Sequence, residues 1–206
     1  MSQDGPAPLI SSRLLKQFVH ATFEEVGVDK LPQVLASAGL SPAVVEAESI
    51  NRLDGRAAAE LYARLQQALR QFYGRGARGT LLRIGRSIWG RMTAEASFLE
   101  KAELEIIRRL PVPARRRRTV DLVAGSLRAG SESTTVHLLD TDLLLVDRSA
   151  AAAAGQESAA PICFVTLGLL EAALYWATGQ PADVEEIACR AMGAPACEFK
   201  VISGGG

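Results

Sequence analysis

The chain has 206 residues, of which 48% are hydrophobic and 22% charged, and 23 acidic side chains balance 23 basic ones. This composition is typical of one folded domain with a substantial core, and it excludes a disordered chain. The balanced charge gives no overall field that would attract nucleic acid or an anionic membrane, so neither is expected as a partner. The polar start contains no signal segment, and three cysteines make no paired disulfide framework, so a cytoplasmic location is expected.

The first half of the chain predicts helices. After a disordered tail over residues 1–10, apolar residues recur at three- and four-residue spacing from Ser11 or Ser12 to Val26, and Gly27 suits a helix end. Further helices are predicted over 31–38, 54–73, 79–93 and 95–110, and a helix or extended piece over 114–128. The helix over 79–93 contains Gly85 and Gly90, which indicates close packing or ligand approach.

The second half changes its pattern. Residues 134–139 and 143–147 are rich in β-formers on either side of Asp140-Thr141-Asp142, which predicts a hairpin. An apolar run over 161–177 predicts a buried helix; it approaches membrane-spanning length, but its Pro161 and central Glu171 argue against a span. The remaining predictions are an amphipathic helix over 182–192, a strand over 197–202 and a tail over 203–206. Residues 11–202 are therefore expected to form a single α+β domain, with helices packed around a small antiparallel sheet.

Three cysteines and one acid form a candidate metal site: Cys163, Glu186, Cys189 and Cys197. Glu186 and Cys189 are three residues apart on one predicted helix and would share a face. Cys163 would lie in the first turn of the buried helix, where the helix dipole favours a thiolate. Three thiolates and a carboxylate can fill a tetrahedral zinc shell. The alternative, on spacing alone, is that these are ordinary buried cysteines.

The same region resembles the 4-vinyl reductase domain family. The resemblance rests on residues 161–168, 184–189, 193 and 197–199, and its strong part covers 134–202. The family includes sensory domains of aromatic-responsive bacterial regulators, in which one Glu and three Cys at matching positions bind zinc. The resemblance therefore implies a zinc site at Cys163, Glu186, Cys189 and Cys197. It also implies a fold similar to vesicle-tethering complex subunits, with helices against a twisted antiparallel sheet, often as a homodimer.

The family name implies reduction of a vinyl group, yet the sequence offers no site for an electron donor. Gly74-x-Gly76-x-x-Gly79 has the spacing of a dinucleotide fingerprint but follows a predicted helix instead of a strand. The sequence thus favours a non-enzymatic role: a sensory or carrier domain with a structural zinc that binds a small apolar or aromatic ligand. Two alternatives stay open, namely an enzyme or accessory protein of tetrapyrrole (bacteriochlorophyll) metabolism and a pure protein-interaction module.

Candidate ligand-binding side chains are the aromatic residues near the glycine-bearing and apolar helices, together with one strand histidine. They are Phe72, Tyr73, Trp89, His137, Tyr175 and Trp176. Ligand pockets are mostly apolar with a few polar groups, which this set could supply. The alternative is that the aromatic residues simply pack in the core. The His–Trp pair that anchors a phenol in the aromatic-responsive regulators has no counterpart in register here, so phenol is not the predicted ligand.

Overall fold

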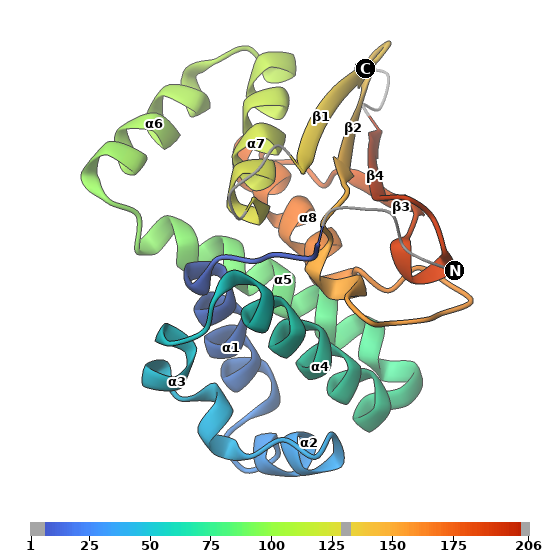
Figure 1. Cartoon of the computed structure of the whole chain (residues 1–206). Coiled ribbons are helices and arrows are strands. Elements are labelled where there is room, and N and C mark those ends of the chain that lie inside the picture. The colour runs from blue at the N-terminus through green and yellow to red at the C-terminus, as the bar shows by residue number, and fades with distance from the viewer. Residues whose placement is uncertain (1–6, 129–132, 203–206) are drawn as a thin grey trace.

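The computed structural model describes residues 7–128 and 133–202, and it has an α+β fold (Figure 1). Helices from the first two thirds of the chain form one side of the molecule, and a four-stranded antiparallel sheet from the last third forms the other. The predicted fold class is confirmed. Residues 1–6 and 203–206 of the predicted tails lie outside the described residues. Ile10, at the end of the first predicted tail, is buried and donates its N–H to the Gly55 carbonyl.

Each predicted helix of the first half is present, with ends set by capping residues. Ser11 caps α1, Asp54 caps α4, and Ser97 forms a capping box with Glu100 on α6. The segment that could be helical or extended is helical, with Pro113 in its first turn. The elements are α1 (Ser12–Val26), α2 (Leu31–Ser37), η1 (Pro42–Val45), α3 (Ala47–Asn51), α4 (Gly55–Tyr73), η2 (Gly74–Gly76), α5 (Ala77–Ala94), α6 (Phe98–Arg109) and α7 (Val112–Leu127).

The sheet has the strand order β1-β2-β4-β3, with every neighbouring pair antiparallel. Its predicted hairpin joins β1 (Thr134–Leu139) to β2 (Asp142–Asp147), and Asp140 in the turn has a φ of 52°, a conformation that Asp tolerates better than most residues. The short η3 (Ala151–Ala153) and the buried helix α8 (Phe164–Thr178) follow. The last elements are β3 (Asp183–Ala188), η4 (Arg190–Met192) and β4 (Cys197–Ile202).

The prediction of an amphipathic helix over 182–192 is wrong, because this segment is strand β3 followed by the short η4. The burial of β3 alternates along the strand: Val184 and Glu186 face inward, while Glu185 and Ile187 face outward. An acid at an inward position and an isoleucine at an outward one conceal the alternation of apolar and polar residues that would identify a strand. Glu186 and Cys189 therefore do not share a helix face.

Helices α5 and α8 cross with their backbones in contact. A Cβ atom added at Gly85 would lie 2.1 Å from the Val165 carbonyl oxygen, and one added at Gly168 would lie 2.1 Å from the Leu82 carbonyl oxygen. Gly85 thus permits close packing, whereas Gly90 on the same helix has nothing within 4 Å of an added Cβ. In the described part of the chain, no helix has the length and hydropathy needed to cross a membrane. Glu171, in the middle of α8, pairs with Arg86 of α5 at 2.7 Å.

Candidate functional site

The four predicted metal ligands lie together in the structure. The sulfur of Cys163 is 3.9 Å from that of Cys189 and 3.5 Å from that of Cys197, and the Cys189 and Cys197 sulfurs are 3.9 Å apart. With a carboxylate oxygen of Glu186, these potential ligand atoms all lie within 4.8 Å of one another. All four residues are buried, Glu186 being the most exposed at 8%. This set is called the Cys3Glu cluster below.

Three separate elements place the Cys3Glu cluster. Cys163 precedes the first residue of α8, and its backbone N–H donates to Glu186 Oε2 at 2.9 Å. A β-bulge lies between Glu186 and Ala188, directly before Cys189. Bulges redirect the side chains of a strand, and this one occurs where β3 leaves the sheet.

The turn between β3 and β4 brings Cys189 next to Cys197. Its carbonyl at Cys189 accepts from the N–H groups of Met192 and Ala194, and Gly193 in the turn has a φ of 90°. The N–H of Arg190 donates to the Cys197 sulfur at 3.3 Å. The turn is thus closed by its own backbone and presents two sulfurs to α8.

The Cys3Glu cluster has the composition and spacing of a metal site. Tetrahedral zinc with Zn–S bonds of about 2.3 Å requires sulfurs about 3.8 Å apart. The observed separations of 3.5 to 3.9 Å agree with that spacing. In addition, Glu186 Oε1 is buried and has no hydrogen-bond partner among the described residues. A buried carboxylate oxygen without a partner is unfavourable, and a metal ion would satisfy it. The cluster is therefore compatible with a bound metal ion.

Negative charge is unfavourable at these side chains when no cation accompanies them. Burial, followed by the charge on Cys189, raises the pKa of Glu186 to about 8. Hydrogen bonds to Cys189 and Cys197, together with burial, raise the pKa of Cys163 well above its ordinary value. A divalent cation supplies the positive charge that stabilises such buried groups in their ionised form.

Helix α4 carries buried polar groups near the cluster. Burial lowers the pKa of Arg70, and negative charge on Cys163 and Cys189 opposes that change. Arg70 donates one N–H to Gln156 at 2.9 Å, while its Nη1 is buried without a partner among the described residues. Arg70 thus places a positive charge near the cysteines, a feature that the sequence did not predict.

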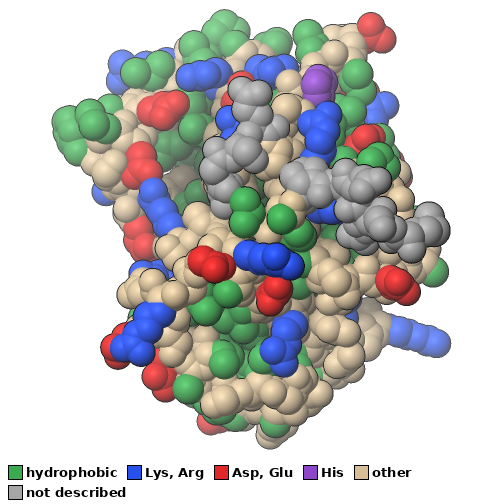
Figure 2. Space-filling view, in the orientation of Figure 1, with side chains coloured by type: hydrophobic (Ala, Val, Ile, Leu, Met, Phe, Trp, Pro, Cys, Tyr) green, Lys and Arg blue, Asp and Glu red, His purple; other side chains and the backbone are tan. Residues whose placement is uncertain are grey.

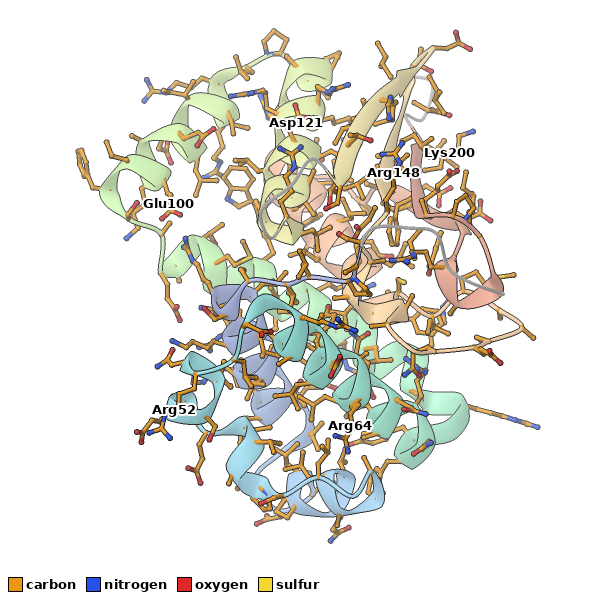
Figure 3. The ribbon with its side chains drawn as sticks, in the orientation of Figure 1. Arg52, Arg64, Glu100, Asp121, Arg148 and Lys200 are labelled. Atoms are coloured by element: carbon orange, nitrogen blue, oxygen red, sulfur yellow. The ribbon has the colours of Figure 1, made fainter. Side chains whose placement is uncertain are left out.

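A separate pocket of about 450 Å³ lies between α1, α5, α6 and α7. The surface is hollowed between the projecting α6 and the body of the molecule (Figure 2). Its apolar lining includes Leu14, Trp89, Met92, Leu104 and Leu122. Two of its acids, Glu100 on α6 and Asp121 on α7, are labelled in Figure 3. We call this space the α1–α7 pocket.

The predicted ligand-binding residues are not brought together in one place. Trp89 lines the α1–α7 pocket, and its ring packs edge-on against that of Trp176 with centroids 5.5 Å apart. Phe72 and Tyr73 contact each other at the end of α4. Tyr175 is exposed, as is His137, which lies on β1 and is 2.9 Å from the Thr135 hydroxyl. The remaining pocket residues come from four helices and were not among the predicted set.

Comparison with known proteins supports the resemblance. Residues 144–203 match the 4-vinyl reductase domain family, and this range contains all four residues of the Cys3Glu cluster. No curated protein matches the chain. Among solved structures, the fold is similar to that of an H-NOX protein from S. oneidensis in the Fe(II)NO ligation state. That comparison has a TM-score of 0.54 and 12% sequence identity, and it covers 94% of this chain and 98% of the other. The Cys3Glu cluster therefore belongs to a C-terminal region that matches the 4-vinyl reductase domain, within an overall fold similar to that of an H-NOX protein.

Proposed function

We propose that this protein is a small-molecule-binding domain, sensory or carrier in role, whose C-terminal part is stabilised by zinc and whose ligand occupies the α1–α7 pocket. The pocket itself carries the proposal. Its volume of about 450 Å³ lies within the range of about 300–1,000 Å³ that is usual for small-molecule sites. The 4-vinyl reductase domain match adds support, as does the likeness to an H-NOX protein whose structure was solved in a ligated state.

The Cys3Glu cluster supports zinc as the metal, and a structural role for it. Sulfur ligands favour zinc over the hard cations magnesium and calcium, which prefer oxygen. Four protein ligands leave no open coordination position for water or substrate, as catalytic zinc requires. Three thiolates and a carboxylate around a divalent ion also leave a negative site, which is a poor Lewis acid. The thiols need to stay reduced for this purpose, as they do in the cytoplasm.

The lining of the α1–α7 pocket supports an apolar or aromatic ligand. Its side walls are leucines, a methionine and an indole ring, which exchange contact with water for contact with a ligand. The polar lining residues lie on the same helices, and several are already joined to one another, such as Arg13 to Glu100 at 2.6 Å. Apolar surface therefore supplies most of the binding free energy.

Filling the pocket tests its role. Gly125 on α7 lines the pocket, and an added Cβ there has nothing within 4 Å, so Gly125→Leu should occupy the space without disturbing the fold. We expect this change to weaken binding of hydrophobic aromatic compounds at least about tenfold, because the ligand and the new side chain compete for one volume. Binding is measured by equilibrium dialysis against a panel that includes tetrapyrroles.

Gly90→Leu is the matched control. Gly90 is an exposed helical glycine that also has nothing within 4 Å of an added Cβ, and it does not line the pocket. It should leave the affinity unchanged. If no compound of the panel binds saturably, or if the two leucine variants bind equally well, the pocket is not the ligand site.

A further inference from the structure

The polar groups that line the α1–α7 pocket differ in whether they have partners. Arg13 donates to Glu100, Gln17 donates to Glu95 at 2.5 Å, and Arg128 donates twice to the Thr134 carbonyl. Asp121 accepts from Arg117 at 3.3 Å. The other polar lining side chains are also engaged: Ser11, Thr93, Glu103 and Ser126. None of these groups needs a ligand to complete its hydrogen bonding.

Trp89 is different. Its side chain lines the pocket and is only 5% exposed, and its indole Nε1 is buried with no hydrogen-bond acceptor among the described residues. An indole nitrogen can only donate, so a buried one needs an acceptor. Buried donors without an acceptor are uncommon in folded proteins and are unfavourable. A ligand that supplied an oxygen here would correct this.

The charges of the lining restrict the ligand further. Three carboxylates, those of Glu100, Glu103 and Asp121, face two guanidinium groups, those of Arg13 and Arg128. The hydrogen bond from Arg13 lowers the pKa of Glu100 to about 2, so this acid stays ionised and paired. An anionic ligand would find no free cation in the described lining and would meet an excess of negative charge.

We propose that the α1–α7 pocket selects neutral apolar molecules that carry one hydrogen-bond acceptor, such as an aromatic ketone, and that Trp89 Nε1 donates to that acceptor. This inference rests on the proposed function, because it requires the pocket to bind a ligand. It adds the chemical class of the ligand and the residue that recognises it. An acceptor placed against an otherwise unsatisfied donor discriminates more strongly than an extra apolar contact does.

Three probes of similar shape test the proposal: benzophenone, diphenylmethane and 4-benzoylbenzoate. The first has a carbonyl acceptor, the second replaces it with a methylene, and the third adds a carboxylate. Equilibrium dialysis with the full chain should give an affinity for benzophenone about tenfold higher than for diphenylmethane. The affinity for 4-benzoylbenzoate should be lower than for benzophenone.

Variants of the two paired tryptophans assign the preference to one N–H group. Trp89→Phe removes the donor and should bring the ratio of the benzophenone and diphenylmethane affinities close to one. Trp176→Phe makes the same change in the neighbouring ring, which does not line the pocket, and should keep the ratio. Melting temperatures of both variants report whether they fold, and the wild-type ratio stands without them.

Several results would overturn this inference. One is equal affinity of the wild-type chain for benzophenone and diphenylmethane, and another is a preference that survives in a folded Trp89→Phe variant. A carboxylate probe that binds as well as benzophenone would refute the exclusion of anions. In these three cases the pocket still binds ligands and the proposed function stands. Failure of all three probes to bind contradicts both the inference and the proposed function.

Discussion

Glu185 and Glu186 are consecutive acids on β3 with opposite surroundings. Glu185 is exposed, whereas Glu186 is 8% exposed and accepts a hydrogen bond from the Cys163 N–H. Because side chains alternate across a strand, one acid lies in the Cys3Glu cluster and its neighbour faces away from it. The pair offers a comparison in which the same chemical change is made at two adjacent positions.

Glu186→Gln should reduce zinc binding, since it replaces an anionic ligand with a neutral amide. We expect at least about a tenfold loss of zinc affinity. At saturating zinc, each tenfold loss lowers the free energy of unfolding by about 1.4 kcal/mol, because the metal binds the folded state. Zinc content by mass spectrometry and melting temperature measure both effects. Glu185→Gln should match wild type in both. Equal zinc content in the two variants would show that Glu186 is not a ligand.

At the residue scale, the sequence predicted the members of the cluster but not its surroundings. Cys163, Glu186, Cys189 and Cys197 were recognised as a set through a family resemblance, since their spacing alone was equally consistent with buried thiols. Arg70 could not be recognised in this way, because it precedes Cys163 by a long stretch of chain and only the packing of α4 places its charge near the cysteines.

At the element scale, the contact between α5 and α8 has no room for a side chain. Gly85→Ala should destabilise the fold by about 1–3 kcal/mol, because its methyl group would overlap the Val165 carbonyl and force the helices apart. This loss exceeds the gain of up to about 1 kcal/mol that alanine brings to a helix in place of glycine.

Gly90→Ala on the same helix makes the same change where an added Cβ meets nothing, and it should leave stability unchanged or raise it. Urea unfolding of both variants gives the comparison. A common unfolding midpoint for the two would mean that α5 and α8 can separate slightly at no expense, and that the close crossing is not required.

The accuracy of the element predictions followed the strength of local signals. Helices α1, α4 and α6 begin at side chains that bond to their own backbone, and these caps are visible in the sequence. Strand β3 has no such signal, and its inward Glu186 belongs to the cluster instead of the apolar core. The element that was predicted wrongly is thus one whose sequence serves the site.

At the scale of the whole molecule, α6 projects from the body and exposes apolar side chains (Figure 1). Phe98, Leu99 and Ile106 are 84%, 78% and 62% exposed. Acids dominate the first turns of α6, and Arg108 and Arg109 end it. Two copies of α6 packed antiparallel about a twofold axis would therefore bury these side chains and place opposite charges together.

We therefore expect a homodimer, with a mass in solution of twice the 21.9 kDa of the chain. Leu99→Glu should convert it to a monomer, because a charge in the buried interface would lack a partner. Val28→Glu, which changes another exposed apolar side chain outside α6, should leave the dimer intact. Light scattering after size exclusion measures the mass. A wild-type mass of 21.9 kDa over a wide concentration range would exclude the dimer.

The α1–α7 pocket could not be predicted from the sequence for a reason that belongs to this scale. Its lining comes from residues between Ser11 and Arg128, on helices whose inward faces look alike in a pattern of apolar spacing. Whether two such faces meet or leave a space depends on how the helices are arranged. Trp89 was the one predicted aromatic residue that proved to line it.

Helix α8 is attached to the rest of the protein at three points along its length. Cys163 at its start belongs to the cluster, Gly168 lies against the backbone of α5, and Trp176 near its end packs on Trp89 of the pocket wall. A stiff rod fixed at its two ends and at a point between them can neither slide nor tilt. Loss of the metal frees one end only, and the rod can then pivot about the glycine contact. The cluster and the pocket wall therefore lie at opposite arms of one lever, although no side chain of one touches the other.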